Sequence, residues 1–327
     1  MHDNQPRLLV FSSLFPHTGA PNAGLFIRER MFRVGHVLPV TVVSPQPWFP
    51  FQGLIRLLKP HFRQPSPRHD VQNGFDVHYP RFLSFPGILK HMDGLFMALG
   101  SYMLVRRLQR EERLQLIDSH FAYPDGYAAT LLGKWLKLPV SITLRGTEVP
   151  LSGYRSRRLR MLRALRRASA VIAVADSLRQ HVAAMGIPAE KITVIGNGVD
   201  TKKFYPVDKL QARSQLDIDA DATVIISVGG LVERKGHHRV IEALPQLLRH
   251  YPELVYLVVG GASAGGLAAA YVAFEHPEVF GNVISQSGAF SFGKPGEEGF
   301  EWLTEQIASR ELVDVRFYLD AGSLETK

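Results

Sequence analysis

A single serine stands in a glycine-rich segment near the C-terminus. Gly261-Ala-Ser263-Ala-Gly265 fits the pattern G-x-S-x-G, which is typical of a strained strand-to-helix turn that exposes a nucleophilic serine. A serine hydroxyl is a weak nucleophile until an adjacent base takes its proton. The segment therefore predicts either acyl transfer at Ser263 or a turn of this shape without a catalytic partner.

A second group of motifs lies upstream, in a fixed order. Glycine lets backbone N–H groups approach a diphosphate at a helix N-terminus, and lysine pairs with phosphate as a point charge. The segments are Phe15–Arg30, which contains Gly24; Ile117-Asp-Ser-His120; Leu144-Arg-Gly-Thr-Glu148; Val194-Ile-Gly-Asn-Gly-Val-Asp200; and Val228–Gly236, which contains Lys235.

Their order and spacing over about 250 residues resemble the family-4 retaining glycosyltransferases of GT-B fold, especially those that build bacterial exopolysaccharide. The resemblance implies a nucleotide-sugar donor, a saccharide or lipid-linked acceptor, and no further cofactor. It implies that His120 lies beside the transferred sugar and that Gly24, Arg234 and Lys235 bind the donor. Relatives usually have an arginine where this chain has Gly230, and Arg234 is the candidate substitute.

The tail resembles a different family, the enterochelin-esterase and esterase-D type of α/β-hydrolase. The similar segments are Gly261–Ala270, His276–Gly281, Val283–Ala289 and Arg316–Glu325. The resemblance implies Ser263 as nucleophile and Glu325 as catalytic acid, with Asp320 as the second choice. The family's catalytic histidine would follow Lys327, so it is missing, and His276 is interpreted as structural.

A junction near residue 260 is the resulting hypothesis. Residues 261–327 contain 10 acidic and 4 basic residues, whereas residues 1–260 contain 20 acidic and 34 basic residues. We predict a glycosyltransferase N-terminal domain over 1–205, a linker and the start of the donor-binding domain over 206–260, and an esterase fragment over 261–327. The family's carboxylate-bearing donor helix would then be absent.

Three functions follow from this hypothesis. The first is glycosyl transfer, impaired because the donor-binding domain is truncated. The second is ester hydrolysis at Ser263. The third is a fusion, natural or engineered, without an evolved function.

Strand and helix patterns alternate along the chain, which favours a mainly parallel sheet covered by helices on both faces. We therefore predict an α/β fold, with a Rossmann-like GT-B N-terminal domain and a hybrid second α/β unit. Proline-rich residues 45–91 are interpreted as a long irregular excursion. The predicted strands are 7–12, 40–44, 75–79, 116–119, 140–144, 170–173, 192–195, 223–228 and 254–259; the helices are 24–34, 126–135, 177–185 and 240–250.

An arginine-rich segment, Arg155–Arg167, has apolar residues at 159, 162 and 165, which predicts a helix with a narrow buried face. Its outer face could contact anionic lipid or remain solvated, and nonspecific nucleic-acid binding is the less favoured alternative. No apolar run reaches the length of a membrane-spanning helix. We expect a cytoplasmic protein, peripheral to the inner face of the membrane if Arg155–Arg167 binds lipid.

Metal binding is not predicted. The chain has no cysteine, which excludes disulfides and thiolate sites. His237 and His238 are adjacent, so they should project in different directions and chelate poorly together.

Overall fold

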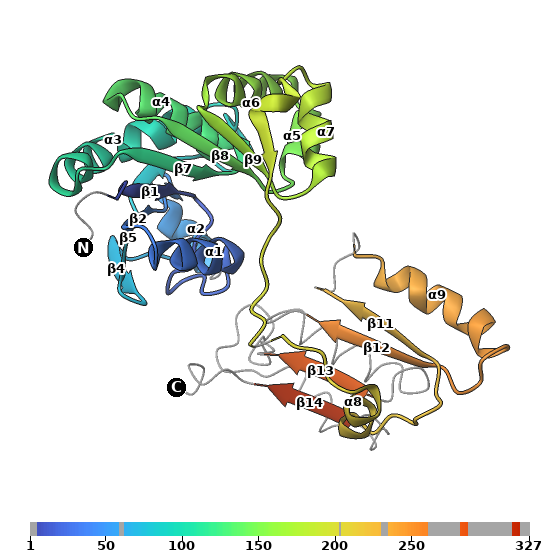
Figure 1. Ribbon diagram of the computed structural model, residues 1–327. Helices are drawn as coiled ribbons and strands as arrows, with labels where there is room; N and C mark the ends of the chain where they lie inside the picture. The colour runs from blue at the N-terminus through green and yellow to red at the C-terminus, as the bar shows by residue number, and fades with distance from the viewer. Residues whose placement is uncertain are drawn as a thin grey trace. The chain divides into compact units, whose positions relative to one another are not determined.

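The computed structural model describes residues 5–58, 62–202, 204–229, 235–260, 282–286 and 316–320, the last two segments through their backbone only. The chain divides into two compact units (Figure 1), unit 1 over Met1–Asp200 and unit 2 over Thr201–Lys327.

Unit 1 is built on an eight-stranded sheet with the order β10-β9-β8-β7-β1-β2-β5-β4. Every neighbouring pair is parallel except β4 with β5. Strands β1, β2 and β8 are buried at every residue, as expected for parallel strands between two helical layers. The strands are β1 Leu8–Phe11, β2 Val40–Val43, β4 His69–Gln72, β5 Phe75–His78, β7 Leu116–His120, β8 Val140–Leu144, β9 Ala170–Ala173 and β10 Ile192–Val194.

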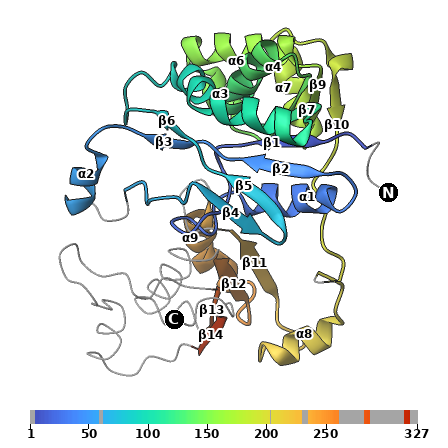
Figure 2. The same ribbon diagram turned by 90° about the vertical axis from the view of Figure 1, so that its left-hand side faces the viewer.

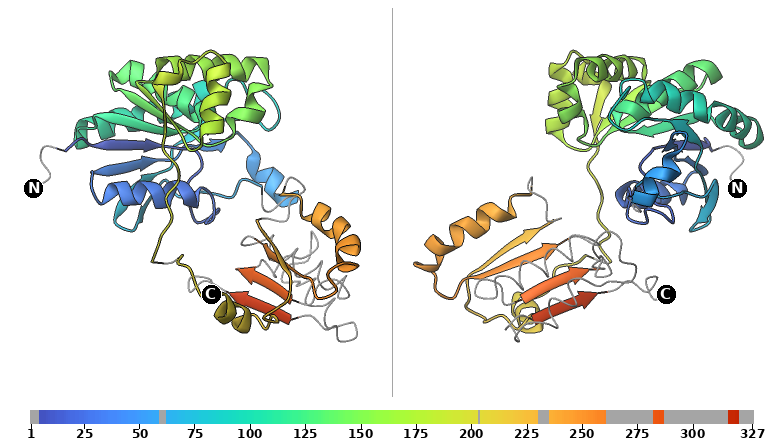
Figure 3. Two further views of the ribbon diagram at one scale, coloured as in Figure 1. Left: turned by 45° about the vertical axis from the view of Figure 1, so that its right-hand side comes forward. Right: turned by 180° about the vertical axis from the view of Figure 1, so that it is seen from behind.

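Helices cover both faces of this sheet. Figures 2 and 3 show α3, α4, α6 and α7 on one face and α1 on the other. The predicted α/β architecture with a parallel sheet is therefore confirmed. The helices of unit 1 outside residues 45–91 are α1 Leu25–Gly35, α3 Asp93–Glu112, α4 Tyr127–Leu136, α5 Glu148–Ser152, α6 Arg155–Arg167 and α7 Asp176–Ala184, with short turns η1 Ala122–Gly126 and η2 Ala189–Lys191.

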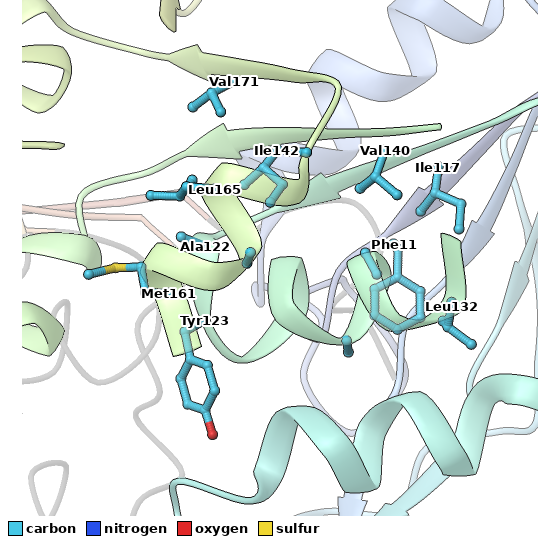
Figure 4. Close-up of a cluster of buried hydrophobic side chains, with 14 of the residues drawn as sticks. Phe11, Ile117, Ala122, Tyr123, Leu132, Val140, Ile142, Met161, Leu165 and Val171 are labelled. Carbon is cyan, nitrogen blue, oxygen red and sulfur yellow. The ribbon is translucent and has the colours of Figure 1, made fainter. Parts of the chain in front are cut away.

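Strand β1 shows why the unit has two cores. Successive side chains of a strand point to opposite faces, so Leu9 and Phe11 join the cluster under α3, α4, α6 and α7, whereas Leu8 and Val10 join the smaller cluster under α1. Figure 4 shows the larger cluster, in which Phe11 and side chains from β7, β8 and β9 meet residues of α4 and α6.

Residues 45–91 are more regular than predicted. The interpretation of an irregular excursion was wrong, because this region contains β3 Gln46–Trp48, α2 Gln52–Leu58, β4 and β6 Arg81–Leu83 in addition to β5, which corresponds to the predicted strand over 75–79. Strands β3 and β6 pair in a separate two-stranded sheet. Pro47 fits there because an edge strand leaves one side of its backbone unpaired.

Unit 2 contains a parallel four-stranded sheet with the order β11-β12-β13-β14. The last two strands come from the segment predicted to be a hydrolase fragment. In the described part of the chain, no helix is long and apolar enough to cross a membrane. The elements are α8 Lys209–Gln215, β11 Val224–Val228, α9 His237–Leu248, β12 Val255–Gly260, β13 Asn282–Gln286 and β14 Arg316–Asp320.

Helix α6 buries a different stripe from the one predicted. Leu162 and Leu165 are buried as expected, together with Met161 and Ala164, but Leu159 is 51 % exposed. The stripe therefore covers one side of the helix only from residue 161 onward.

This difference can be tested with two leucines of α6. We expect Leu165→Ala to lower the free energy of unfolding of unit 1 by about 3 kcal/mol, because it opens a cavity in the core. Leu159→Ala should change it by less than about 0.5 kcal/mol. Urea unfolding followed by circular dichroism measures both, and equal losses would contradict the assigned burial.

Candidate functional site

The carboxyl ends of β1, β7 and β8 meet at one edge of the unit 1 sheet. Ligands of open α/β sheets bind outside these strand ends. Three polar residues occupy this edge: Ser13 follows β1, His120 ends β7 and Arg145 follows β8.

Arg145 connects the upstream motifs. Its Nη2 donates to Nδ1 of His120 at 3.1 Å, and its Nη1 donates to Oδ1 of Asn197 at 2.8 Å. The guanidinium carbon lies 5.3 Å from the centre of the Phe26 ring, a cation–π distance. Burial, together with the like charge of Arg30, lowers the pKa of Arg145 to about 10. One side chain thus contacts residues from all the other unit 1 motifs.

These contacts determine the tautomer of His120. A guanidinium only donates hydrogen bonds, so Nδ1 of His120 is the acceptor and Nε2 carries the proton. Burial and the charges of Arg145 and Arg30 lower the pKa of His120 well below its ordinary value, so the ring is neutral at pH 7. Its Nε2 lies 3.7 Å from Oδ2 of Asp118 and has no hydrogen-bond partner among the described residues.

Glu148 connects the loops that follow β7 and β8. It is buried at the start of α5. Its Oε1 accepts from the backbone N–H of Ala122 at 3.0 Å, and its Oε2 accepts from those of Arg145 and Gly146 at 3.2 and 2.8 Å. Its negative charge also favours the protonated form of Arg145. Glu148 therefore fixes the loops after β7 and β8.

Asp125 performs the same task for the loop after β1. Its carboxylate accepts from the backbone N–H of Ser13 and, at 3.1 Å, from the Ser13 hydroxyl. Burial raises the pKa of Asp125 to about 7, against the hydrogen bonds from Ser13, which lower it. A third buried carboxyl, Asp118, accepts from the Ser141 hydroxyl at 2.5 Å, and burial raises its pKa as well.

Gly24 has a local structural role. Its φ is 68°, and a Cβ at this position would lie 2.3 Å from the carbonyl oxygen of Leu14. Only glycine tolerates this close approach. Helix α1 begins immediately afterwards, at Leu25, so Gly24 sets the path of the loop into the helix. Donor contact at Gly24 stays a prediction.

Lys235 lies in unit 2, between β11 and α9. It is exposed and immediately precedes Gly236, the N-cap of α9. Its side-chain carbons pass over Gly229, where a Cβ would lie 3.4 Å from Cδ. Arg234 and Gly230 lie outside the described residues.

The predicted esterase residues are not brought together in the described part of the chain. Ser263 and Glu325 lie outside it, and Asp320 is described only as the last backbone position of β14. In unit 2, His237 is buried and His238 exposed. The described residues contain no group of three metal-ligating side chains.

Sequence reasoning missed Arg145, Asn197, Asp125 and Glu148 as individual site residues. A usable signal was present, because Arg145 directly follows a strand buried throughout. The pairing of Asp125 with Ser13 joins residues 112 positions apart, and no local pattern predicts it.

The family comparisons agree with the upstream motifs. The model for Glycosyltransferase Family 4 matches residues 38–203, and the model for Glycosyl transferases group 1 matches residues 208–319. The second match continues across residue 261. It therefore gives no support to the predicted junction or to an esterase part.

Curated relatives are also glycosyltransferases. The putative teichuronic acid biosynthesis glycosyltransferase TuaC of Bacillus subtilis is 27 % identical over 265 residues, which are 79 % of this chain and 67 % of that protein. A D-inositol 3-phosphate glycosyltransferase of Segniliparus rotundus is 37 % identical over 94 residues, 29 % of this chain and 20 % of that protein.

Two solved structures share the fold. Anabaena Alr3699/HepE in complex with UDP and glucose has a TM-score of 0.52 and 18 % identity, covering 98 % of this chain and 70 % of that chain. The complex of the same protein with UDP has a TM-score of 0.51 and 17 % identity, and it covers 97 % of this chain and 70 % of that chain. This likeness confirms the predicted Rossmann-like GT-B architecture.

The raised pKa of Asp125 predicts a pH-dependent stability. Between about pH 4 and pH 7 the folded Asp125 carboxyl holds a proton that the unfolded chain has lost, so the contribution of Asp125 to stability falls as the pH rises through this window. Asp125→Asn keeps an acceptor for Ser13 and should flatten this fall, measured as the urea midpoint from about pH 5 to pH 8. Asp118 contributes a slope of the same sign in both proteins. The lowered pKa values of His17, His78 and His120 contribute a slope of the opposite sign in both proteins.

Asp176→Asn is the matched control. Asp176 is exposed, and its hydrogen bonds from Arg179 and Gln180 lower its pKa, so this variant should keep the parent slope. An Asp125→Asn variant with an unchanged slope would contradict the assignment of the titration to Asp125.

Proposed function

Because the chain belongs to glycosyltransferase family 4, we propose that it transfers a sugar from a nucleotide-sugar donor to a saccharide or lipid-linked acceptor. The exopolysaccharide-type acceptor is part of this proposal. The alignment spans 67 % of TuaC and a fifth of the inositol phosphate enzyme, so donor, acceptor and turnover are all proposed here.

The convergence on Arg145 carries the proposal. Phe26, His120 and Asn197 come from motifs that are far apart in the sequence, and each contacts Arg145 at the ligand-binding edge of the sheet. A preorganised guanidinium in a partly buried place stabilises negative charge better than one in water. Arg145 and Arg30 therefore suit a site in which a sugar leaves a diphosphate.

His120 is proposed to position the transferred sugar. Its neutral ring has a buried Nε2–H without an acceptor, and an unmade buried hydrogen bond costs about 1–3 kcal/mol. A sugar hydroxyl that reaches this N–H would recover that free energy. Because its pKa is lowered, His120 acts as a hydrogen-bond donor and not as a cation at pH 7.

Lys235, with Arg234, is proposed to bind the donor diphosphate. Lys235 stands before the N-terminus of α9, where the helix dipole also favours an anion. Gly24 is proposed to let the backbone N–H groups at the start of α1 in unit 1 come close to the donor.

Two variants separate donor binding from transfer. Lys235→Ala should weaken binding of uridine diphosphate by about tenfold or more, the loss of one charge-assisted contact, whereas Lys209→Ala, an exposed lysine of α8, should leave it unchanged. His120→Ala should lower turnover of a nucleotide sugar by about tenfold to a hundredfold, with a smaller loss of diphosphate binding, because Arg145 keeps its hydrogen bond to Asn197. Calorimetry measures the binding of uridine diphosphate, and an assay of the nucleotide product formed per unit time measures turnover.

Unchanged binding in Lys235→Ala, or unchanged turnover in His120→Ala, would count against the assigned roles. The same assay addresses the expected impairment of transfer. A turnover equal to that of TuaC would contradict that expectation.

Ester hydrolysis is not proposed. The side chains it needs lie outside the described residues, and the relatives named above are glycosyltransferases. Labelling by a fluorophosphonate that disappears in Ser263→Ala would be the result to reinstate it.

We further propose that α6 contacts an anionic membrane surface. Its outward face presents an exposed group of arginines at positions 155, 158, 163, 166 and 167, while Met161, Leu162 and Leu165 face the core. Because the apolar stripe is buried in the protein, it cannot insert into lipid. The contact is therefore electrostatic and should weaken with salt.

The membrane proposal predicts that a triple Arg158→Gln, Arg163→Gln, Arg166→Gln variant loses binding to phosphatidylglycerol-containing vesicles. Each arginine near such a surface contributes about 1 kcal/mol, so the loss should exceed about tenfold in a sedimentation assay. The control removes the same charge elsewhere, through Arg110→Gln, Arg113→Gln and Arg249→Gln. Equal losses, or full binding by the α6 variant, would contradict the proposal and direct attention to α2, where Leu57 and Leu58 are 79 % and 83 % exposed.

A further inference from the structure

Two cavities of unit 1 meet at Arg81. The first, of about 230 Å³, is lined by residues that include Trp48, Gln46 and Gln52; the second, of about 630 Å³, by residues that include Arg68 and Arg107; and Arg81 lines both. The lining elements β3, β5, β6 and α3 lie close together in Figure 2. The two cavities are therefore neighbours on either side of the Arg81 side chain, and together they are here called the Arg81 groove.

Glycine fixes the middle of the groove. A Cβ on Gly100 of α3 would lie 2.5 Å from the carbonyl oxygen of Arg81, so the helix and β6 are in direct backbone contact. Tyr79 lies beside the junction. Its hydroxyl donates to the carbonyl oxygen of Pro16 and accepts from Gln72 at 2.9 Å. These contacts fix the backbone of β6 against α3 and hold the Tyr79 ring beside Arg81.

The first cavity has the chemistry of a sugar subsite. Trp48 offers an aromatic ring, and aromatic rings combine apolar area with defined geometry. Gln52 is more than nine-tenths buried, and its Oε1 has no hydrogen-bond partner in the described part of the chain. A buried amide oxygen without a donor is unfavourable, and a ligand hydroxyl would satisfy it.

The second cavity has the chemistry of an anion subsite. Arg68, Arg81 and Arg107 line it, and no aspartate or glutamate belongs to its described lining. Arg107 has one weak ion pair, to Glu111 at 3.7 Å with both side chains more than half exposed. Neither Arg68 nor Arg81 has an ion-pair partner among the described residues. Guanidinium groups bind carboxylate and phosphate through paired N–H donors.

Two other arginines line the first cavity, and they differ from those of the second cavity because they donate hydrogen bonds to backbone carbonyl oxygens. Arg56 donates to the carbonyl oxygens of Phe62 and Arg63, and Arg63 donates to that of Ser84 at 2.6 Å. They therefore shape the wall with their hydrogen bonds while adding positive charge. The described lining of this cavity also contains no carboxylate.

We propose that the Arg81 groove binds an acidic saccharide, with a sugar ring on Trp48 and Gln52 and its carboxylate or phosphate among Arg68, Arg81 and Arg107. This inference rests on the proposed function, because such a saccharide would be the acceptor. It adds the charge of the acceptor, which the family assignment does not supply.

Calorimetry without any donor tests the groove directly. We expect tetragalacturonate or maltotetraose 1-phosphate to bind at least about tenfold more tightly than neutral maltotetraose. Arg81→Gln and Arg107→Gln should each weaken acidic binding by about tenfold.

Arg110→Gln is the matched control, because Arg110 is exposed on the same helix as Arg107 but does not line the groove. It should change acidic binding by less than about twofold. Equal binding of acidic and neutral probes, or equal losses in Arg107→Gln and Arg110→Gln, would overturn the proposal. Binding without nucleotide-sugar turnover would support the groove and count against the proposed transfer; turnover without acidic binding would do the opposite.

Discussion

The unit 1 site depends on the placement of the Arg145 guanidinium in a partly buried, desolvated position. A desolvated charge is costly unless it is paired and hydrogen-bonded. The positive charge of Arg30 disfavours the protonated form of Arg145, and the negative charges of Asp118 and Glu148 favour it. The bonds to His120 and Asn197 then fix the direction of the guanidinium. Burial, together with the charges of Arg145 and Arg30, lowers the pKa of His120, so the chemistry of the histidine depends on its burial and on the placement of the arginine.

Backbone hydrogen bonds fix the geometry of the residue next to His120. Phe121 has φ 70° and ψ 138°, a conformation that costs a residue with a side chain about 1–3 kcal/mol. It is held from both sides: its N–H donates to Thr143 at 2.9 Å, and its carbonyl oxygen accepts from Gly126 at 2.9 Å. A Cβ on Gly126 would lie 2.8 Å from that oxygen. The turn after β7 is therefore strained but fully determined, and it orients the preceding histidine.

Local pattern predicted the strands of unit 1 well, because a parallel strand between helices must be apolar. Val140–Leu144 and Ala170–Ala173 have the predicted bounds. The same reasoning failed where the energetics are not local. Leu159 fits the helical period of α6 but is 51 % exposed, since burial depends on what packs against each turn of the helix and not on its period alone. Residues 45–91 were misjudged because prolines exclude central strands but not short edge strands.

The loop between β1 and α1 couples the two parts of the proposed site. Near one end, Asp125 binds Ser13; at the other, the left-handed backbone of Gly24 admits the loop to α1. Between them, His17 lines the first cavity of the Arg81 groove, and its ring lies 5.7 Å from that of Tyr79 in an edge contact. The carbonyl oxygen of Pro16 accepts a hydrogen bond from the Tyr79 hydroxyl. A saccharide in the groove would therefore touch a loop whose ends are both fixed. Fixing such a loop during folding removes an ordering cost from binding, which is the condition a transferase needs to align an acceptor with a donor.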